Sequence, residues 1–429
     1  MTRWTISLDG GPRRVNHAAV AIGKHIYSFG GYCSGEHQEV RKLLDVHVLD
    51  TTNYRWKKLE KANEFCSAHL LAETDSVNID DYLQGPVTHR DETPYQRYGH
   101  TVVEYGGKAY LWGGRNDDFG ASNVLHSFDP ENRRWERIDV TGFVPAARDG
   151  HTAVVVENKM VLFGGFEEDA QRFSQETFIF DFDTRKWSEL KTTGTPPLWR
   201  DFHTAAAIDG VMYVFGGRSD QNGQVGDDEL FHSSRDTYDD KLMALDLKTA
   251  HWRVVKASGK TPLGRRSHSA WVYNGKMFIF GGYLGTRNRH FNELYCFDPK
   301  TNEWDIIEAF GTYPSPRRRH CSVVVDNRVF LFGGTSPSNR CYRNFNNVMS
   351  NFSSLQSGLS DLSDMHVLDY SPSLFQLSAT EVLKRNLPNT NIYECLKDEL
   401  PFDVRLNLYC MTEPNQLNQQ TTHRAEIAG

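Results

Sequence analysis

The stretch that decides the fold is Arg200 to Gly217, RDFHTAAAIDGVMYVFGG. Its arginine is followed three residues later by a histidine, and the first glycine of a Gly-Gly pair comes thirteen residues after that histidine. The same spacing occurs six times, at these arginine, histidine and glycine positions: Arg14, His17, Gly30; Arg97, His100, Gly113; Arg148, His151, Gly164; Arg200, His203, Gly216; Arg265, His268, Gly281; and Arg317, His320, Gly333. A spacing that is kept six times indicates six copies of one structural unit.

A second mark follows each glycine pair. In five copies an aspartate is followed six residues later by a tryptophan, and the sixth copy has a phenylalanine at the tryptophan position: Asp50 and Trp56, Asp129 and Trp135, Asp181 and Trp187, Asp246 and Trp252, Asp298 and Trp304, and Asp369 and Phe375. The apolar runs between these marks, such as HTAVVV (151 to 156) and KMVLF (159 to 163), are too short for helices and are typical of buried strands. A period of roughly fifty residues made of such runs predicts an all-β fold, a six-bladed propeller with four-stranded blades.

The N-terminal segment predicts how the ring of blades closes. RWTISL (3 to 8) reads as the fourth strand of a blade, although it precedes the first blade. We therefore expect residues 3 to 8 to complete the sixth blade, whose other strands come from about 317 to 370. The competing candidate for that fourth strand is SLFQL (373 to 377), which lacks the tryptophan.

The glycine pair and the spaced tryptophan resemble the kelch repeat, and the resemblance covers residues 1 to 370. It implies a six-bladed kelch β-propeller with blades that start near residues 14, 97, 148, 200, 265 and 317. The expected organisation is a propeller over 1–370, a helical segment over 371–412 and a disordered tail over 413–429.

Composition limits the classes of function. The chain has 429 residues, 39% of them apolar, and a net charge of −7, which argues against a nucleic-acid-binding protein. It has no apolar run of 18 residues and no secretory leader pattern, so we expect no membrane association. Seven scattered cysteines without a C-x-x-C pair predict neither disulfides nor a zinc site, and they indicate the cytoplasm or the nucleus.

Three long insertions, at 60–95, 218–240 and 335–362, are predicted to lie on one face of the propeller, because the connections that they occupy share one end of an antiparallel meander. Insertions on one face of a repeat protein are typical of a binding face. The mouth of that face should carry the residues that follow the glycine pairs (Tyr32, Arg115, Phe166, Arg218, Tyr283 and Thr335) and those inside the Arg-x-x-His elements (Tyr98, Asp149, Asp201, Phe202, Arg266, Ser267, Arg318 and Arg319), with Trp199 just before one of them.

The residues that differ between the blades are the candidates for binding. The repeated arginines and histidines recur in every blade, so we assign them a structural role. Guanidinium groups can hold a carboxylate with two hydrogen bonds, and an aspartate can select a cationic side chain beside it, which suits the end of a peptide. The candidate binding residues are Arg218, Arg266, Ser267, Arg115, Arg319, Asp149, Asp201, Trp199, Tyr98 and Phe166.

The segment after Asp369 predicts helices, and it resembles the elongin-binding box of cullin-2 ubiquitin-ligase receptors. In that box a serine-leucine pair is followed at four-residue steps by a cysteine and an aliphatic residue, and Ser373, Leu374 and Val382 match while Ser378 replaces the cysteine. Downstream, the stretch from Leu400 through Pro401 to Val404 is similar to the cullin-2 box, and an earlier Leu387-Pro388 fits less well. The alternative is an ordinary pair of helices that caps the propeller.

Together these resemblances imply a substrate receptor of a cullin-2 RING ligase, with elongin B, elongin C and cullin-2 with its RING subunit as partners. Such receptors bind proteins that end in glycine, here after arginine, lysine or glutamine, and perform no chemistry themselves. Arg218 matches the arginine with which the family holds the terminal carboxylate, and Arg266 is our second candidate for that contact. The terminal Gly429 raises the hypothesis that the chain occupies its own pocket.

Two other classes remain open from the sequence. A kelch scaffold for the cytoskeleton or chromatin predicts the same propeller without elongin binding. A metal-dependent kelch oxidase would need a cluster of tyrosine, histidine and cysteine, for which only Tyr32 and Cys33 near His37 come into question. We expect no cofactor and no metal.

Overall fold

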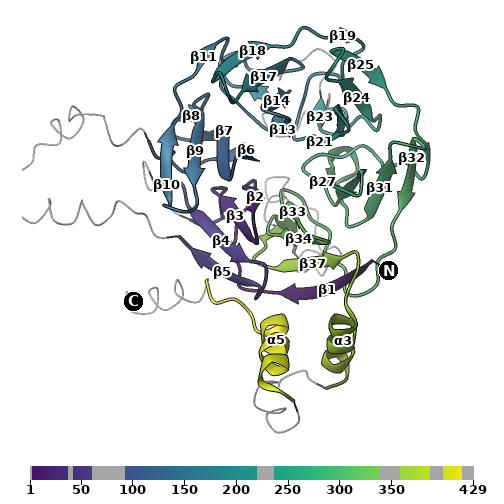
Figure 1. Ribbon diagram of the computed structural model, residues 1–429. Coiled ribbons are helices and arrows are strands. Elements are labelled where there is room, and N and C mark those ends of the chain that lie inside the picture. Colours follow the sequence, from purple (N-terminus) through teal and green to yellow (C-terminus); the bar gives the residue numbers. More distant parts are fainter. Residues whose placement is uncertain are drawn as a thin grey trace, which may run out of the picture.

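The computed structural model describes residues 2–36, 42–59, 92–219, 236–338, 358–386 and 400–417. In these residues six antiparallel sheets stand side by side in a ring (Figure 1). The chain therefore forms the predicted six-bladed kelch propeller. Of the three long insertions predicted at 60–95, 218–240 and 335–362, residues 60–91, 220–235 and 339–357 lie outside the described residues.

Each of the first three blades is a meander that runs from an inner strand to an outer one. Blade one consists of β2 (Ala18–Ile22), β3 (His25–Phe29), β4 (Val46–Asp50) and β5 (Arg55–Lys58). Blade two consists of β6 (Tyr98–Tyr105), β7 (Lys108–Asn116), β9 (His126–Asp129) and β10 (Arg134–Arg137), with the short β8 (Gly120–Ala121) paired to β7. Blade three consists of β13 (Thr152–Val156), β14 (Lys159–Phe163), β17 (Thr177–Asp181) and β18 (Lys186–Glu189).

The other three blades repeat this order. Blade four consists of β21 (Thr204–Ile208), β22 (Val211–Phe215), β24 (Met243–Asp246) and β25 (His251–Val254). Blade five consists of β27 (Ser269–Tyr273), β28 (Lys276–Phe280), β31 (Leu294–Asp298) and β32 (Glu303–Ile306). Blade six consists of β33 (Cys321–Val325), β34 (Arg328–Phe332), β37 (Met365–Asp369) and β1 (Arg3–Leu8).

Shorter strands join the blades and shape one end of the ring. The chain that enters blades three, four and five pairs in parallel with the outer strand of that blade through β11 (Thr141–Gly142), β19 (Thr193–Gly194) and β26 (Ser258–Gly259). At the end where the inner strands begin lie β12 (Arg148–Asp149), β15 (Phe166–Glu167), β16 (Arg172–Phe173), β20 (Arg200–Asp201), β23 (Arg218–Ser219), β29 (Tyr283–Leu284), the 3-10 helix η2 (Gly285–Arg287), β30 (Arg289–His290), β35 (Thr335–Pro337) and β36 (Leu359–Asp361).

Strand β1 closes the ring as predicted. It pairs antiparallel with β37, so residues from the start of the chain supply the fourth strand of blade six. Trp4 takes the place of the missing tryptophan: its side chain is buried, with the ring of Phe280 5.7 Å and that of Tyr313 6.0 Å away. The competing segment SLFQL begins a helix instead. Serine starts it with a capping box, because Ser373 Oγ accepts a hydrogen bond from Gln376 N (3.2 Å) and Gln376 Oε1 accepts one from Ser373 N (2.7 Å).

A ring of backbone hydrogen bonds also links all six blades around the axis. The third residue of every Arg-x-x-His element has a positive φ, and its N–H donates to the carbonyl of the equivalent residue in the preceding blade. The six bonds are Asn16 to Arg319 (3.1 Å), Gly99 to Asn16 (3.0 Å), Gly150 to Gly99 (2.9 Å), Phe202 to Gly150 (2.7 Å), Ser267 to Phe202 (2.8 Å) and Arg319 to Ser267 (2.8 Å). The inner strands contact their neighbours in the same order, from β2 through β6, β13, β21 and β27 to β33 and back to β2.

The glycine pairs are required by the close approach of the next blade. A Cβ on Gly216, which has φ +68°, would lie 2.4 Å from the carbonyl oxygen of Arg265 in blade five. No side chain fits at that distance, and L residues rarely adopt that φ. The pair therefore lets adjacent blades pack at their inner ends.

Two helices, α3 (Leu374–Asn386) and α5 (Phe402–Thr412), lie outside the ring next to β1 (Figure 1). Ala379 of α3 and both Leu408 and Met411 of α5 are buried in the core that blades six and one share. The helical C-terminal segment is thus anchored where the ring closes.

The expectation that the tail is disordered from residue 413 is wrong for residues 413–417. Asn415 is buried, its Oδ1 accepts a hydrogen bond from Trp56 N (2.9 Å), and its backbone N donates to Asp9 O (2.8 Å). Arg55 donates to the carbonyl of Glu413 (2.7 Å). The sequence around Asn415 is polar and does not predict this packing. The packing depends on backbone groups of Trp56 and Asp9, which bond with Asn415. Residues 418–429, including Gly429, lie outside the described residues.

Candidate functional site

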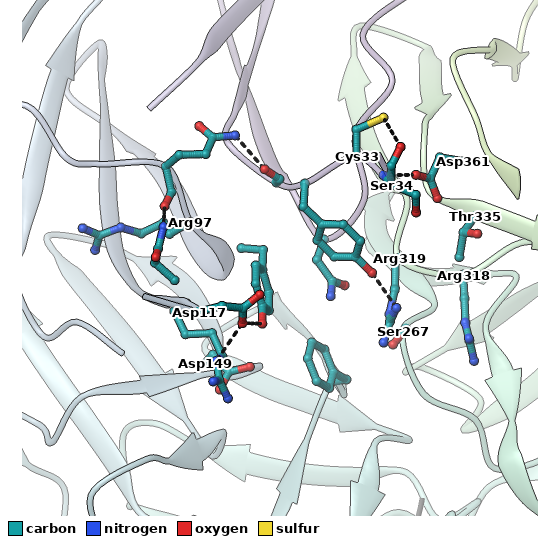
Figure 2. A pocket seen from close by; sticks show the side chains of 18 of the residues that line it. Cys33, Ser34, Arg97, Asp117, Asp149, Ser267, Arg318, Arg319, Thr335 and Asp361 are labelled. Carbon is teal, nitrogen blue, oxygen red and sulfur yellow. Dashed lines mark hydrogen bonds and ion pairs between the residues drawn. The ribbon is translucent and has the colours of Figure 1, made fainter. Parts of the chain in front are cut away.

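A cavity of about 500 Å³ opens at the end of the ring where the inner strands begin (Figure 2). Every blade contributes to its lining. The lining includes Asn16 and Tyr32 of blade one, Tyr98 and Arg115 of blade two, Asp149 and Phe166 of blade three, Asp201, Phe202 and Arg218 of blade four, Arg266 and Ser267 of blade five, and Arg318, Arg319 and Thr335 of blade six.

The wall of the cavity is built from one small pairing per blade. The residue after each repeated arginine pairs antiparallel with the residue after the glycine pair of the same blade. These pairs are Val15 with Tyr32, Tyr98 with Arg115, Asp149 with Phe166, Asp201 with Arg218, Arg266 with Tyr283, and Arg318 with Thr335. Because the backbone of this pairing is the same in every blade, the identity of the two residues alone varies the chemistry of the wall.

The repeated arginines have the structural role that we expected. In blades two to six the Nη1 of each donates to the carbonyl oxygen of the first glycine of the pair, from Arg97 to Gly113 (3.3 Å), Arg148 to Gly164 (3.1 Å), Arg200 to Gly216 (2.7 Å), Arg265 to Gly281 (3.0 Å) and Arg317 to Gly333 (3.3 Å). Arg14 instead contacts Asp45 (2.7 Å) and Glu36 (2.8 Å). These side chains tie the start of each inner strand to the turn after the second strand.

The repeated histidines join neighbouring blades. The Nε2 of four of them bonds a hydroxyl of the preceding blade: His151 with Thr101 (2.8 Å), His203 with Thr152 (2.8 Å), His268 with Thr204 (2.7 Å) and His320 with Ser269 (2.9 Å). Burial lowers the pKa of His203 to about 3, so this ring stays neutral at physiological pH.

Thr204→Val should lower the free energy of unfolding by about 1 to 3 kcal/mol, because the isosteric valine leaves His268 Nε2 buried without its partner. Urea denaturation measures this loss. Thr184→Val, at an exposed turn position, is the matched control and should change stability by less than about 0.5 kcal/mol. Equal stability of the two variants would contradict the structural role of the histidine.

One side of the cavity is basic. Arg266, Arg318 and Arg319 come from the starts of blades five and six, and the first two are buried. Arg319 donates to Tyr32 Oη (2.6 Å), and the Cζ of Arg318 lies 4.2 Å from the centre of the Tyr283 ring. Three guanidinium groups on one side of the cavity form a strong attraction for an anion.

Arg318 has few polar partners among the described residues. It is 8% exposed, and in the described part of the chain its Nε and Nη1 have no hydrogen-bond partner. Burial and repulsion from Arg319 and Arg266 lower its pKa to about 10, so it remains charged at neutral pH. A buried charged donor without a partner is costly, and a carboxylate bound in the cavity would compensate the charge of Arg318.

Sequence reasoning did not select Arg318 as a binding residue, although it placed it at the mouth. Arg317, Arg318 and Arg319 are adjacent in the sequence, and only the first belongs to the repeat. A signal was present, because Arg318 occupies the same wall position as Asp149, Asp201 and Arg266.

Arg218 and Asp201 line the cavity, as predicted, and they form an ion pair with each other. Arg218 donates from Nε to Asp201 Oδ1 (3.2 Å) and from Nη2 to Asp201 Oδ2 (2.6 Å), and both residues are buried. This pairing raises the pKa of Arg218 above its ordinary value, and the carboxylate of Asp201 already accepts two charged hydrogen bonds. Neither side chain therefore presents an uncompensated charge to a ligand as Arg318 does.

The opposite side of the cavity carries Asp149. Its side chain is 5% exposed, lines the cavity, and forms no hydrogen bond or ion pair within the described ranges. The nearby Arg115 is directed instead to Glu168 (3.4 Å) and Asp117 (3.9 Å). Burial, and then repulsion from Asp201, raise the pKa of Asp149 to about 7.

Tyr98, Phe166 and Ser267 line the cavity as predicted, and Trp199 does not. Tyr98 donates to Asp117 Oδ1 (2.6 Å), and its ring lies 5.3 Å from that of Tyr32. The expectation for Trp199 is wrong because the chain there is still crossing from β19, beside the outer strand β25, toward the axis, which it reaches only at β20.

The predicted elongin-binding residues lie on the outer side of α3. Leu374 is 82% exposed and Ser378 is exposed, whereas Val382 is half-buried. Ala379, on another face of the same helix, is buried against the propeller. The helix thus leaves its first turn available to a partner.

The predicted cullin-binding residues divide into two groups. Leu400 and Val404 pack partly against the core that blades six and one share, and Pro401, at the start of α5, is exposed. Two further apolar side chains of α5 are exposed, Phe402 (60%) and Leu406 (43%). The motif resemblance rests on Leu400, Pro401 and Val404 and not on these two positions, and the leucine and the valine of that motif are partly buried.

Within the described ranges, no group of three or more His, Cys, Asp or Glu side chains is placed to hold a metal ion. His37, which the oxidase alternative requires, lies outside those ranges. Among the helices that the structure describes, none is both long and apolar enough to cross a bilayer.

Comparison with known proteins agrees with this geometry. Residues 99–334 match the KLHDC2/KLHL20/DRC7 Kelch-repeats domain, and residues 13–61 match the Kelch motif. The chain is 42% identical over 419 residues to kelch domain-containing protein 3 of Homo sapiens and of Bos taurus, which covers 98% of this chain and 98% of each of theirs. It is 28% identical over 276 residues to acyl-CoA-binding domain-containing protein 5 of Arabidopsis thaliana, which covers 62% of this chain and 40% of that one.

The likeness to kelch domain-containing protein 3 extends beyond the repeats to the C-terminal helices, since the alignment covers nearly the whole of both chains. Segments that flank the repeated residues, such as GGPRRVNHAAVA and SFGGYCSG, also resemble kelch domain-containing protein 3. The chain belongs to the kelch-repeat family, as an orthologue of kelch domain-containing protein 3.

Proposed function

We propose that this chain is the substrate-recognition subunit of a cullin-2 RING ubiquitin ligase and that its cavity binds the C-terminal carboxylate of proteins that end in glycine. The observation that carries this proposal is the buried Arg318, which lines the cavity with Arg266 and Arg319 and whose Nε and Nη1 have no hydrogen-bond partner among the described residues. A carboxylate is the common biological anion whose two oxygens match a guanidinium.

A chain end fits this cavity better than an internal acidic side chain does. The cavity is lined by residues of all six blades around one axis, a shape that suits the end of a polypeptide. A terminal glycine has no Cβ beside its carboxylate, so it needs the least room at the wall. Ser267 follows Arg266 in the chain, belongs to the ring of backbone hydrogen bonds and lines the cavity, so it adds a hydroxyl next to the basic side.

The C-terminal helices support the second half of the proposal. A leucine that is 82% exposed at the first turn of a helix anchored to the propeller is the kind of apolar residue that a partner protein buries. We propose that α3 binds elongin C, with Leu374, Ser378 and Val382 at the contact, that elongin B accompanies it, and that the start of α5 with Pro401 approaches cullin-2. Leu400 and Val404 then hold that start in position rather than contacting cullin-2 directly.

In this function the chain performs no chemistry. It holds the target in the cavity and the ligase at its helices, so a partner's ubiquitin-loaded enzyme acts on a tethered protein. These partners place the chain in the cytoplasm or the nucleus. A kelch scaffold without a ligase role is the second candidate, and it predicts the same cavity without elongin binding.

Immobilised peptides test the cavity half of the proposal. A ten-residue peptide ending in Arg-Gly with a free carboxylate should capture the full-length chain, and the same peptide with a C-terminal amide should not. Amidation removes the negative charge that would pair with the guanidinium of Arg318. A peptide ending in Arg-Ala should bind less well than the glycine peptide. Equal capture by the acid and the amide would contradict carboxylate recognition, and co-purification with elongin B and elongin C separately decides the ligase half.

A further inference from the structure

The cavity holds two buried charges of opposite sign that no other residue described by the structure pairs. Arg318 belongs to blade six, and Asp149 belongs to blade three. In the order of contacts around the ring, these blades are three steps apart in either direction, so they face each other across the axis. Figure 2 shows the two residues on opposite sides of the cavity.

This arrangement is selective for a ligand that carries both charges. An anion alone would satisfy Arg318 and leave Asp149 unpaired, and a cation alone would do the reverse. A polypeptide end with a basic residue beside its terminal glycine supplies both groups in one short segment. The sequence offered Asp149 and Asp201 equally for the cation, but the two hydrogen bonds from Arg218 to Asp201 decide between them.

We propose that Asp149 is the residue that recognises a positively charged side chain next to the terminal glycine, across the cavity from Arg318, and that protonation of its carboxylate weakens this recognition. The inference rests on the proposed function, because it takes the terminal carboxylate to lie at Arg318. It adds the residue that sets the preference for arginine or lysine and makes that preference depend on pH.

The surroundings of Asp149 set the direction of the pH effect. The charged and titratable groups that face it are Tyr98 and Arg115 of blade two, Glu168 of its own blade, and Asp201 and Arg218 of blade four. Burial and the two acidic neighbours outweigh the two arginines, so its pKa lies near 7 before a ligand binds. A cation beside it would lower that pKa, so binding releases protons at neutral pH.

The direction of the pH dependence of peptide affinity follows from this pKa. Above pH 7 the carboxylate is ionised and attracts the cation, and below pH 7 it is increasingly neutral, so affinity for the basic peptide falls as the pH falls. We expect an Arg-Gly peptide to bind about tenfold more weakly at pH 6 than at pH 8. A Gln-Gly peptide should change little, because a glutamine amide can bond either form of the carboxyl group.

Neighbouring histidines do not confuse this measurement. Burial holds the pKa of His100, His203 and His290 near 3, so these rings are neutral throughout the range from pH 6 to pH 8. Acetylated peptides without histidine carry no group of their own that titrates in this range.

The test titrates Arg-Gly and Gln-Gly peptides against the full-length chain from pH 6 to pH 8. Asp149→Asn, which keeps the shape of the side chain, should bind the two peptides alike and lose the pH dependence of the Arg-Gly peptide, while its affinity for the Gln-Gly peptide stays within about twofold of the wild type. Asp169→Asn removes an exposed carboxylate from the same blade and should leave the wild-type pattern unchanged.

The outcomes separate this inference from the proposed function. If free-acid peptides bind better than amides but the Asp149→Asn variant still prefers Arg-Gly, or if the wild type shows no pH dependence, the role of Asp149 is wrong and carboxylate recognition stands. If acid and amide bind equally, the proposed function fails first. Binding of the Gln-Gly peptide by Asp149→Asn shows that the variant is folded. Calorimetry in two buffers of different ionisation enthalpy should in addition detect release of about half a proton when Arg-Gly binds at pH 7.

Discussion

Arg318→Ala should weaken binding of a peptide with a free terminal glycine carboxylate by about 30-fold to several thousand-fold. The physical reason is that the carboxylate would lose a charged partner in a buried place, where water compensates poorly. Isothermal titration or fluorescence anisotropy with the Arg-Gly peptide measures the loss. Amidation of the peptide should weaken binding strongly in the wild type and add little in the variant, because both changes remove the same interaction.

The stability of the variant gives an independent signature. Nε and Nη1 of Arg318 have no partner among the residues that the structure describes, so alanine removes an unsatisfied buried charge. The free energy of unfolding should therefore not fall by more than about 1 kcal/mol, which corresponds to the lost contact with the Tyr283 ring. A large loss of stability would show that Arg318 supports the fold instead of the ligand.

Two other arginines serve as comparisons. Arg253→Ala, at an exposed position on the outer strand β25, should leave peptide affinity within about twofold of the wild type. Arg218→Ala should lower stability as well as affinity, since it leaves the buried Asp201 carboxylate without its two hydrogen bonds. Affinity that falls in Arg253→Ala as much as in Arg318→Ala would contradict a specific carboxylate site.

Leu374→Ser should reduce binding to a purified complex of elongin B and elongin C by about 30-fold or more, a loss of about 2 kcal/mol or more. Leu374 is 82% exposed in the free chain, so its replacement takes no apolar surface out of the core. In the complex, by contrast, the side chain would be buried, and a serine hydroxyl would be desolvated there without a partner. Calorimetric titration with the elongin complex gives the affinity.

The control for this variant is Leu263→Ser. Leu263 is 38% exposed and precedes blade five, away from α3. This change should leave elongin binding intact, and both variants should still bind the Arg-Gly peptide because the cavity is formed by the propeller. Undiminished elongin binding by Leu374→Ser would exclude the proposed contact and favour the scaffold function.

The two predictions concern two separate sites of the proposed function, the cavity and the C-terminal helices. The proposed peptide site is at the axis, and the helices are anchored at the closure between blade six and blade one. Asn415 and Arg55 add polar contacts that fasten the end of α5 to blade one. A propeller without flexible joints between the two sites would hold a bound target at a constant position relative to the ligase.

The sequence by itself determined everything that depends on the repeat. The six spacings predicted six blades, and the extra strand at Trp4 predicted the closure, because both follow from hydrophobic periods and from the rule that each blade needs four strands. The spacing also located the wall of the cavity: Asp149, Arg266 and Arg318 occupy the same position of their blades, so their backbones had to lie around one axis.

Only the tertiary structure decided which of these wall residues carry an unpaired charge. Arg218 and Asp201 were predicted as ligand contacts, and in the structure they also bind each other, whereas Asp149 and Arg318 remain without a partner in the residues described. The repeat places each backbone, but the end of an arginine or aspartate side chain can reach several neighbours that come from distant parts of the chain. Which neighbour it pairs with depends on the packing of all six blades at the axis, and no local spacing contains that information.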